Sequence, residues 1–153
     1  VIYEIFRTMA RSARSALAMA GPVRYGTDYD ILHRAALRSQ AQAFDADWVF
    51  QFVRGDGEGY DWGLNVTECG LCKFYRSRGA QELVPYICLS DYVASKALNL
   101  GLVRYRTLAE GSNVCDLRYK AGRPSYVYPL REDWPPQFLT SAPEPRLRPG
   151  VLP

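Results

Sequence analysis

Four cysteines are the residues of this chain best suited to chemistry, and two of them stand close together. Cys69 and Cys72 form a C-x2-C motif where a predicted strand gives way to a predicted helix. If Thr67 caps that helix, Cys69 lies in its first turn, where unpaired amides and the helix dipole favour a thiolate. Cys72 shares the same helix face. A zinc ribbon would need a second such pair, which the sequence lacks.

A second group combines a thiol with a carboxylate. Cys88 and Asp91 are three residues apart in a predicted helix, so they point the same way. Asp91 stands in an otherwise apolar stretch, where an unpaired charge is costly. We therefore expect it to have a partner, which is a cation, a metal ion or the amidine of a substrate.

A third group follows in the next predicted hairpin. Arg104 and Arg106 share one face if they lie in a strand, and they would suit a carboxylate if that face lines a pocket. Cys115 begins the predicted return strand. The alternative is that the cysteines are small core residues and the arginines a solvated sheet face. The sequence leaves both interpretations open.

Composition limits the function classes. The chain has 153 residues, enough for one domain, and a net charge of +3 without the dense basic stripe of a nucleic-acid-binding protein. No apolar run is long enough to span a bilayer, and no export signal is evident. We therefore expect a cytoplasmic protein that acts on a small molecule, with a homodimer allowed. In that compartment cysteines serve as thiols, metal ligands or catalytic groups.

The predicted elements alternate between helical and strand patterns. The order predicts an α+β domain with an antiparallel sheet of about four strands in two hairpins, helices packed on one face, and a helical N-terminal segment. We expect a single domain at residues 1–131, with a helical part at 1–45 and a motif-bearing core at 46–120, followed by a tail at 132–153. Six prolines after Trp134 keep that tail out of any helix. The predicted helices are residues 2–20, 29–44, 68–78 and 80–98, the last with Pro85 in its first turn or at a break, and the strands are 47–54, 60–66, 102–108 and 114–119.

Three runs of sequence, in order, resemble the L-2-amino-thiazoline-4-carboxylic acid hydrolase family. They are VTECxxCK at residues 66–73, ELVPxxCxxDY at 82–92 and RTLAEGxxxCDxR at 106–118. The resemblance implies a hydrolase that opens a cyclic isothiourea to give N-carbamoyl-cysteine. With this chemistry in view, the candidate catalytic residues are Cys69, Asp91, Cys88, Cys115 and Glu68, and the candidate substrate-binding residues are Arg104, Arg106, Thr107 and Glu110.

The implied ring opening requires attack at the carbon between nitrogen and sulfur. A thiolate such as Cys69 can attack directly, or a metal ion held by thiolates and Asp91 can activate water. The cofactor is therefore either none or a divalent metal such as zinc, with Cys69, Cys88, Asp91 and Cys115 as candidate ligands. Asp91 or Glu68 would pair with the cationic amidine, and Arg104 or Arg106 with the ring carboxylate.

The element order is also similar to the vinyl-4-reductase type of ligand-binding domain. Such domains use cysteines and an acidic residue to hold zinc, and they act as small-molecule sensors. A sensor domain with a cysteine and carboxylate metal site is therefore the alternative function. Both functions predict that Cys69, Cys88, Asp91 and Cys115 converge on one pocket, because reacting groups must reach one substrate or metal.

Overall fold

The computed structural model describes residues 29–126. The predicted helix at residues 2–20 and the proline-rich tail at 132–153 lie outside that part. None of the helices within the described range is both long and apolar enough to cross a membrane. The helices are α2 (Tyr29–Ser39), α3 (Gly70–Ser77), α4 (Val84–Ile87) and α5 (Ser90–Ala97), the 3-10 helices are η1 (Gln81–Leu83) and η2 (Leu108–Glu110), and the strands are β1 (Val49–Arg54), β2 (Trp62–Glu68), β3 (Leu100–Val103) and β4 (Cys115–Ala121).

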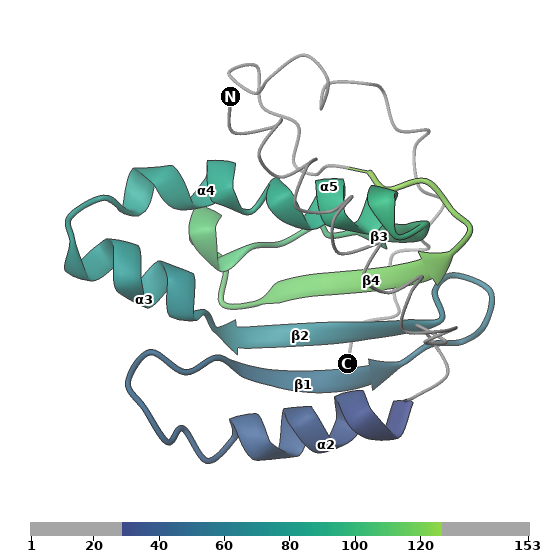
Figure 1. Ribbon diagram of the computed structural model, residues 1–153, viewed down its shortest axis with the longest axis horizontal. Helices are drawn as coiled ribbons and strands as arrows, with labels where there is room; N and C mark the ends of the chain where they lie inside the picture. The colour runs from purple at the N-terminus through teal and green to yellow at the C-terminus, as the bar shows by residue number, and fades with distance from the viewer. Residues whose placement is uncertain (1–28, 127–153) are drawn as a thin grey trace, which may run out of the picture.

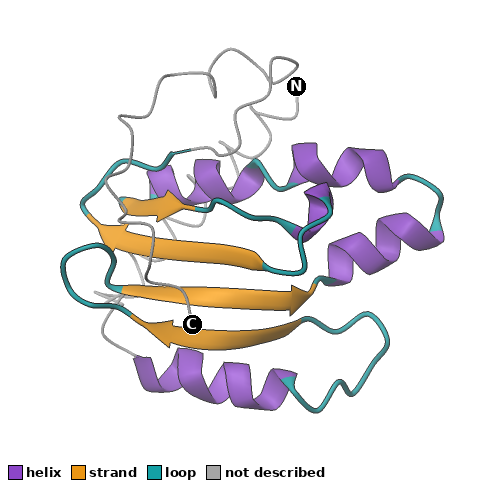
Figure 2. Cartoon of the chain, turned by 180° about the vertical axis from the view of Figure 1, so that it is seen from behind, coloured by secondary structure: helices purple, strands orange, loops and turns teal. Residues whose placement is uncertain are grey.

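The four strands form one antiparallel sheet in the order β1-β2-β4-β3 (Figures 1 and 2). This confirms the predicted α+β class. The register places Val66 opposite Cys115 and Leu64 opposite Leu117, and directly opposed residues share a face of the sheet. β2 and β4 are therefore the central strands, and Cys115 opens one of them.

One face of the sheet carries the hydrophobic core. Strand residues of β2, β3 and β4 meet α5 there, and Leu102 is completely buried. Trp62 stacks on Tyr119 with ring centroids 4.1 Å apart, which extends the same face. Fully burying a large aliphatic side chain stabilises a fold by about 1.5–3 kcal/mol, so this layer fixes α5 on the sheet. The core cluster consists of Val66, Cys69, Leu89, Tyr92, Val93, Leu102, Cys115 and Leu117.

Helix α2 covers the β1 end of the same face. The rings of Tyr29 and His33 lie 5.8 and 6.2 Å from that of Phe52, which shares its face with Leu64. At the C-terminal end of α2, the Ser39 hydroxyl accepts from the Phe50 N–H and donates to its C=O, both at 3.1 Å. α2 therefore also blocks the free edge of β1, and it ends at Ser39 rather than at residue 44.

The predicted strand at residues 102–108 is wrong beyond Val103. The Asp116 carboxylate accepts hydrogen bonds from the backbone N–H groups of Tyr105, at 2.9 Å, and Arg106, at 2.7 Å. Those amides are therefore unavailable for a longer ladder, and the chain leaves the sheet at Arg104. The expected tight hairpin turn is instead the short helix η2, which ends at Gly111 in the left-handed conformation (φ 89°).

The predicted helix at residues 80–98 is three short helices, η1, α4 and α5. Pro85 is the second residue of α4, where its missing N–H costs no helical hydrogen bond. The break that proline favours is therefore present, and it separates Cys88, at the end of α4, from Asp91 in the first turn of α5.

Candidate functional site

Cys69 sits at the junction between β2 and α3. Thr67 belongs to β2 and its hydroxyl donates to the Val49 carbonyl at 3.3 Å, so the predicted Thr67 cap is wrong. Cys69 itself is the N-cap of α3, with extended backbone (φ −119°, ψ 119°) and a buried side chain that makes no capping hydrogen bond. The side chain is left to contact its neighbours in the core.

The glycine between the two cysteines is required by packing. A Cβ at Gly70 would lie 2.4 Å from the Ala46 carbonyl oxygen and 2.5 Å from Trp48 Nε1. Glu68 is committed nearby to an ion pair with Lys73 at 2.6 Å, and Lys73 also donates to the Asp47 carbonyl at 2.9 Å. The hydrogen bond from Lys73 lowers the pKa of Glu68. Glu68 therefore helps to fix the start of α3.

Cys72 faces Cys69 across the first turn of α3. Burial raises the pKa of Cys72 to about 12, and the neighbouring Cys69 adds to the rise. The Cys72 thiol therefore stays protonated at neutral pH.

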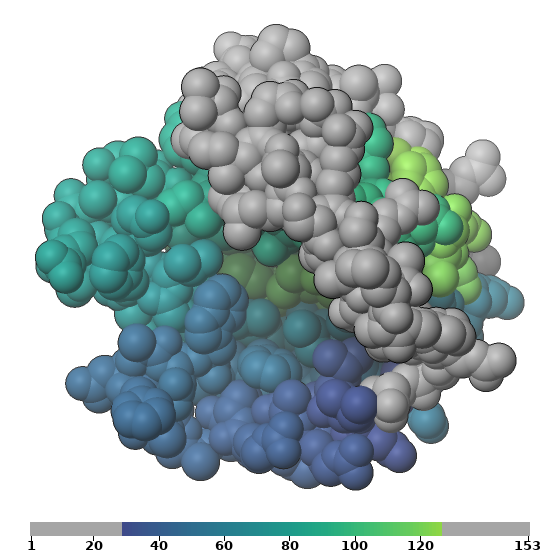
Figure 3. Space-filling model, viewed as in Figure 1, coloured from purple at the N-terminus to yellow at the C-terminus, as the bar shows by residue number. Residues whose placement is uncertain are grey.

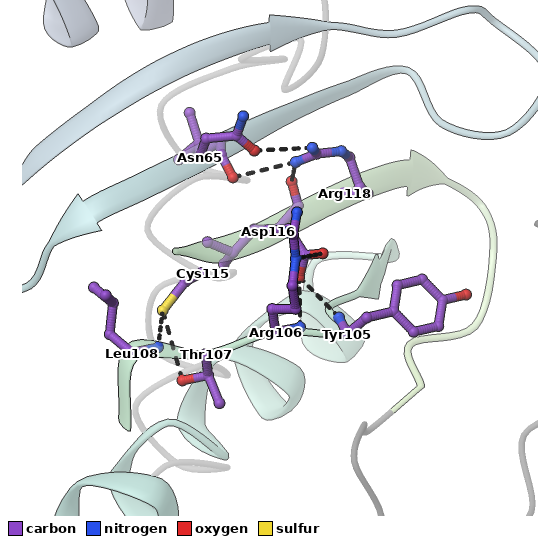
Figure 4. Close-up of polar contacts among 10 residues, drawn as sticks. Asn65, Tyr105, Arg106, Thr107, Leu108, Cys115, Asp116 and Arg118 are labelled. Atoms are coloured by element: carbon purple, nitrogen blue, oxygen red, sulfur yellow. Dashed lines mark hydrogen bonds and ion pairs between the residues drawn. The ribbon is translucent and has the colours of Figure 1, made fainter. Parts of the chain in front are cut away.

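Cys115 lies at the start of β4, against the connection that contains η2 (Figure 4). The Leu108 N–H donates to its sulfur at 3.2 Å, and its S–H donates to the Thr107 hydroxyl at 3.6 Å. Thr107 caps η2 by accepting from the Ala109 N–H at 3.2 Å. Burial raises the pKa of Cys115, while the Leu108 and Thr107 hydrogen bonds and nearby Arg104 oppose the rise. The sulfur is thus a neutral thiol whose surroundings would stabilise its anion.

Arg104 is the buried cation of the site, with only 4% of its side chain exposed. It donates through Nη1 to Asp91 Oδ2 at 2.8 Å and through Nη2 to the Cys88 carbonyl at 3.3 Å. Its guanidinium lies 5.1 Å from the centre of the Tyr92 ring. Its Nε–H is buried and has no hydrogen-bond partner among the described residues. An unmet donor on a buried cation calls for an acceptor from outside the described residues, such as a bound ligand.

Asp91 has the partner that its apolar surroundings predicted, and this partner is Arg104. Burial raises the pKa of the Asp91 carboxyl, and the Arg104 guanidinium opposes that rise. Because 42% of the side chain is accessible to solvent, we expect the ion pair to prevail and the carboxylate to be charged at neutral pH. A half-exposed anion thus stands beside a buried cation.

Cys88 completes this group. Burial raises the pKa of Cys88 to about 12, with Arg104 opposing and Asp91 adding to the rise. Cys69 and Cys115 belong to the same core cluster, and the Cys88 carbonyl contacts Arg104. The convergence of all four groups on one pocket stays a prediction.

Arg106 does not belong to this group, so the predicted shared face with Arg104 is wrong. Its Nε donates to Asp116 Oδ2 at 3.2 Å, on the opposite side of β4 from Cys115 (Figure 4). Asp116 is buried and also holds two backbone amides of the connection. The sequence assigned no role to Asp116, although its place beside Cys115 shows that it faces the other way. Glu110 is exposed at the end of η2.

Arg118 lies flat on the same outer face of the sheet. It donates to Asn65 Oδ1 at 2.8 Å and to the Leu64 carbonyl at 3.3 Å (Figure 4), and it stacks over the ring of Tyr60 at 5.4 Å. Burial lowers its pKa. A Cβ at Gly63 would lie 2.8 Å from Arg118 Cδ, so only glycine leaves room for the guanidinium to cross.

The helix-bearing face is hollowed in the space-filling view, between the α3–α4 segment and α2, with the sheet at the floor (Figure 3). The candidate metal ligands do not gather into a cation site. Within residues 29–126, no three His, Cys, Asp or Glu side chains lie close enough together to hold one metal ion. The part of the chain that the structure describes therefore offers thiols and an Arg–Asp pair here, without a three-ligand cation site.

Comparison with known proteins gives one match. No curated protein and no solved structure matches this chain. The family model described as L-2-amino-thiazoline-4-carboxylic acid hydrolase matches residues 1–119, a range that includes Cys69, Asp91, Arg104 and Cys115. The match covers well over half of the 153 residues, so the chain belongs to the L-2-amino-thiazoline-4-carboxylic acid hydrolase family.

Proposed function

We propose that this protein hydrolyses a cyclic isothiourea carboxylate of the L-2-amino-thiazoline-4-carboxylate type to N-carbamoyl-cysteine. The observation that carries the proposal is Arg104, a buried guanidinium with an unpartnered Nε–H beside the accessible carboxylate of Asp91. The substrate is a zwitterion, with a carboxylate at one end and a protonated amidine at the other. In the Arg104–Asp91 pair, the guanidinium is the complement of the substrate carboxylate, and the Asp91 carboxylate is the complement of the amidine.

Each end of the substrate has a stated partner. The Arg104 Nε–H donates to the ring carboxylate, and the Asp91 carboxylate accepts from the amidine nitrogens. Charge-assisted hydrogen bonds of this kind contribute about 1.5–3 kcal/mol each. A ligand without net charge leaves the Arg–Asp pair neutral overall, which avoids burying an uncompensated charge.

We assign the attack on the ring to Cys115. The Leu108 N–H at 3.2 Å and the nearby Arg104 guanidinium supply the stabilisation that a developing sulfur anion needs. The Cys115 sulfur bonds to the carbon between nitrogen and sulfur, the bond from that carbon to the ring sulfur breaks, and the Cys115 proton passes to the departing sulfur. Water then attacks the same carbon, which releases the Cys115 thiol and leaves the urea group of N-carbamoyl-cysteine.

Turnover of L-2-amino-thiazoline-4-carboxylate by the full chain is the direct test. We expect a new free thiol and the mass of N-carbamoyl-cysteine in the product. Because the leaving sulfur stays attached, the intermediate on Cys115 should have the mass of protein plus the whole substrate. Cys115→Ala should bind substrate but form neither adduct nor product. A Cys115→Ala variant that retains turnover would contradict the assignment.

A ligand-binding sensor is the second candidate. The observation in its favour is that burial keeps Cys72 and Cys88 protonated, with pKa values raised to about 12, as in a site that binds without reacting. The same experiment separates the two functions. Saturable binding of the thiazoline carboxylate with no product would support the sensor and contradict the hydrolase.

A further inference from the structure

The Thr107 hydroxyl contacts the Cys115 sulfur, and the mechanism above gives it no role. Thr107 is a candidate substrate-binding residue by sequence, but in the structure it is buried, with 3% of the residue exposed. Its oxygen accepts from the Cys115 S–H at 3.6 Å and from the Ala109 N–H at 3.2 Å. A hydroxyl oxygen has two acceptor lone pairs, so both are engaged. The Thr107 oxygen therefore has no lone pair left for a substrate.

Three of the four directions around the Cys115 sulfur are occupied. One is the bond to Cβ, one is the hydrogen bond from the Leu108 N–H at 3.2 Å, and one is the S–H that donates to Thr107. Figure 4 shows both partners on the same side of the sulfur, where η2 begins. A thiol sulfur has one hydrogen and two lone pairs, so one lone pair remains free. It points away from η2.

We propose that Thr107 is a positioning residue, which aims the free lone pair of Cys115 by holding the S–H hydrogen in a fixed direction. The inference rests on the proposed function, because only that mechanism makes the Cys115 sulfur the nucleophile. Without the Thr107 oxygen, the S–H would turn about the Cβ–Sγ bond and take the place of the free lone pair. The bonds made and broken stay those of the mechanism above, and Thr107 neither gains nor loses a proton.

Thr107 is itself held in place, as a positioning residue must be. Its backbone is extended (φ −143°, ψ 139°), and its side chain caps η2 through the Ala109 N–H. The branched Cβ restricts rotation of the side chain. The second partner of the sulfur, the Leu108 N–H, belongs to the backbone at the start of the same helix. Two consecutive residues thus fix the direction of attack.

The S–H stretching band of Cys115 tests the hydrogen bond without any turnover. Infrared difference spectra of each protein against its Cys115→Ala counterpart separate this band from those of the other three thiols. Thr107→Val keeps the branched shape and removes the acceptor, so the band should shift to higher frequency. Thr107→Ser keeps the hydroxyl and should keep the wild-type band. An unmoved band in Thr107→Val would overturn the proposal.

Kinetics of the full chain with L-2-amino-thiazoline-4-carboxylate test the consequence for attack. In Thr107→Val, kcat should fall roughly 10- to 100-fold, the cost of misplacing a reacting group. KM should stay unchanged, because Arg104 and Asp91 still hold the substrate. Thr107→Ser should restore most of kcat. A higher KM with unchanged kcat would assign Thr107 to substrate binding and overturn the proposal.

Gly111→Ala is the matched control for the cap that Thr107 provides to η2. Gly111 ends η2 with φ 89°, so a side chain there strains the same helix, and the added Cβ would meet no described atom within 4 Å. The Tm of this variant should fall, while its S–H band and kcat stay at the wild-type values. A loss of kcat as large as in Thr107→Val would trace the effect to η2 and overturn the proposal. Failure of the proposed function would appear as absence of product from the wild type, whereas failure of this inference appears only in the variants.

Discussion

Replacing Arg104 with lysine separates the proposed carboxylate anchor from the ion pair that supports it. Lysine keeps a positive charge beside Asp91 but removes the Nε–H and the branch that donates to the Cys88 carbonyl at 3.3 Å. Losing one charge-assisted hydrogen bond to the substrate costs about 1.5–3 kcal/mol. At about 1.36 kcal/mol per tenfold change, kcat/KM should fall roughly 10- to 150-fold.

The assay compares two substrates on two proteins. One substrate is L-2-amino-thiazoline-4-carboxylate, and the other is the same ring without its carboxylate. Wild-type protein should prefer the first by roughly 10- to 150-fold in kcat/KM, the energy of that one hydrogen bond. Arg104→Lys should lose most of this preference, because the deleted groups on protein and ligand are the two halves of one interaction.

Arg106→Lys is the matched control. Arg106 bonds Asp116 on the outer face, and its side chain is 41% exposed, so this variant should keep the preference for the carboxylate. Arg104→Lys should also remain folded. It loses one hydrogen bond of about 1 kcal/mol, which lowers the Tm of a chain of this size by roughly 2–4 °C. Full retention of the preference by Arg104→Lys, or its loss in Arg106→Lys, would refute the assignment of the carboxylate to Arg104.

Two further predictions concern stability. Asp116→Ala leaves the Tyr105 and Arg106 amides without their acceptor, which should cost about 3 kcal/mol and lower the Tm by roughly 6–12 °C in calorimetry. Asp116→Asn keeps one acceptor oxygen and should lose less, and an unchanged Tm in Asp116→Ala would show that the carboxylate does not hold this connection. Burial raises the pKa of Cys88 to about 12, above the roughly 8.5 of an unfolded thiol. The stability gained by burying the protonated thiol is therefore complete below about pH 8.5 and is lost as the pH rises toward 12. Cys88→Ala lacks this group, so its Tm should fall less steeply than that of the wild type between about pH 8.5 and 11; parallel Tm curves would contradict the reasoning.

The strands were predictable where local pattern decides them. The β1–β2 hairpin is close in sequence and joined by a glycine-rich turn, so composition alone indicated it. The pairing of β2 with β4 was not predictable in this way, because about fifty residues separate Val66 from Cys115. The pairing of β2 with β4 depends on the shared burial of their apolar faces under α5. That burial exists only in the folded protein, so the linear sequence does not reveal it.

The site was predictable in its residue types but not in its contacts. The cost of a lone charge showed that Asp91 needs a partner, yet nothing in the sequence identified Arg104 as that partner. Alternation along a strand predicted that Arg106 shares a face with Arg104. The prediction was wrong because two backbone amides donate to Asp116, which ends the strand early. Threonine is a common helix N-cap residue, but as a β-branched residue it also suits a strand. In the structure the Thr67 hydroxyl donates to the Val49 carbonyl of β1.

The outer-face guanidinium of Arg118 has a consequence for how this sequence can tolerate insertions and deletions. Cys115 and Asp116 are neighbours on β4 that face opposite sides, so a slip of one residue against β2 would exchange a thiol for a carboxylate beside Arg104. Arg118 crosses over Gly63 to reach Asn65, and no side chain one place along the strand could occupy that gap in the same way. This contact therefore acts as a register lock. Insertions or deletions in the loop before β4 are therefore tolerable only when the loop changes its own path and the register of β4 against β2 stays the same.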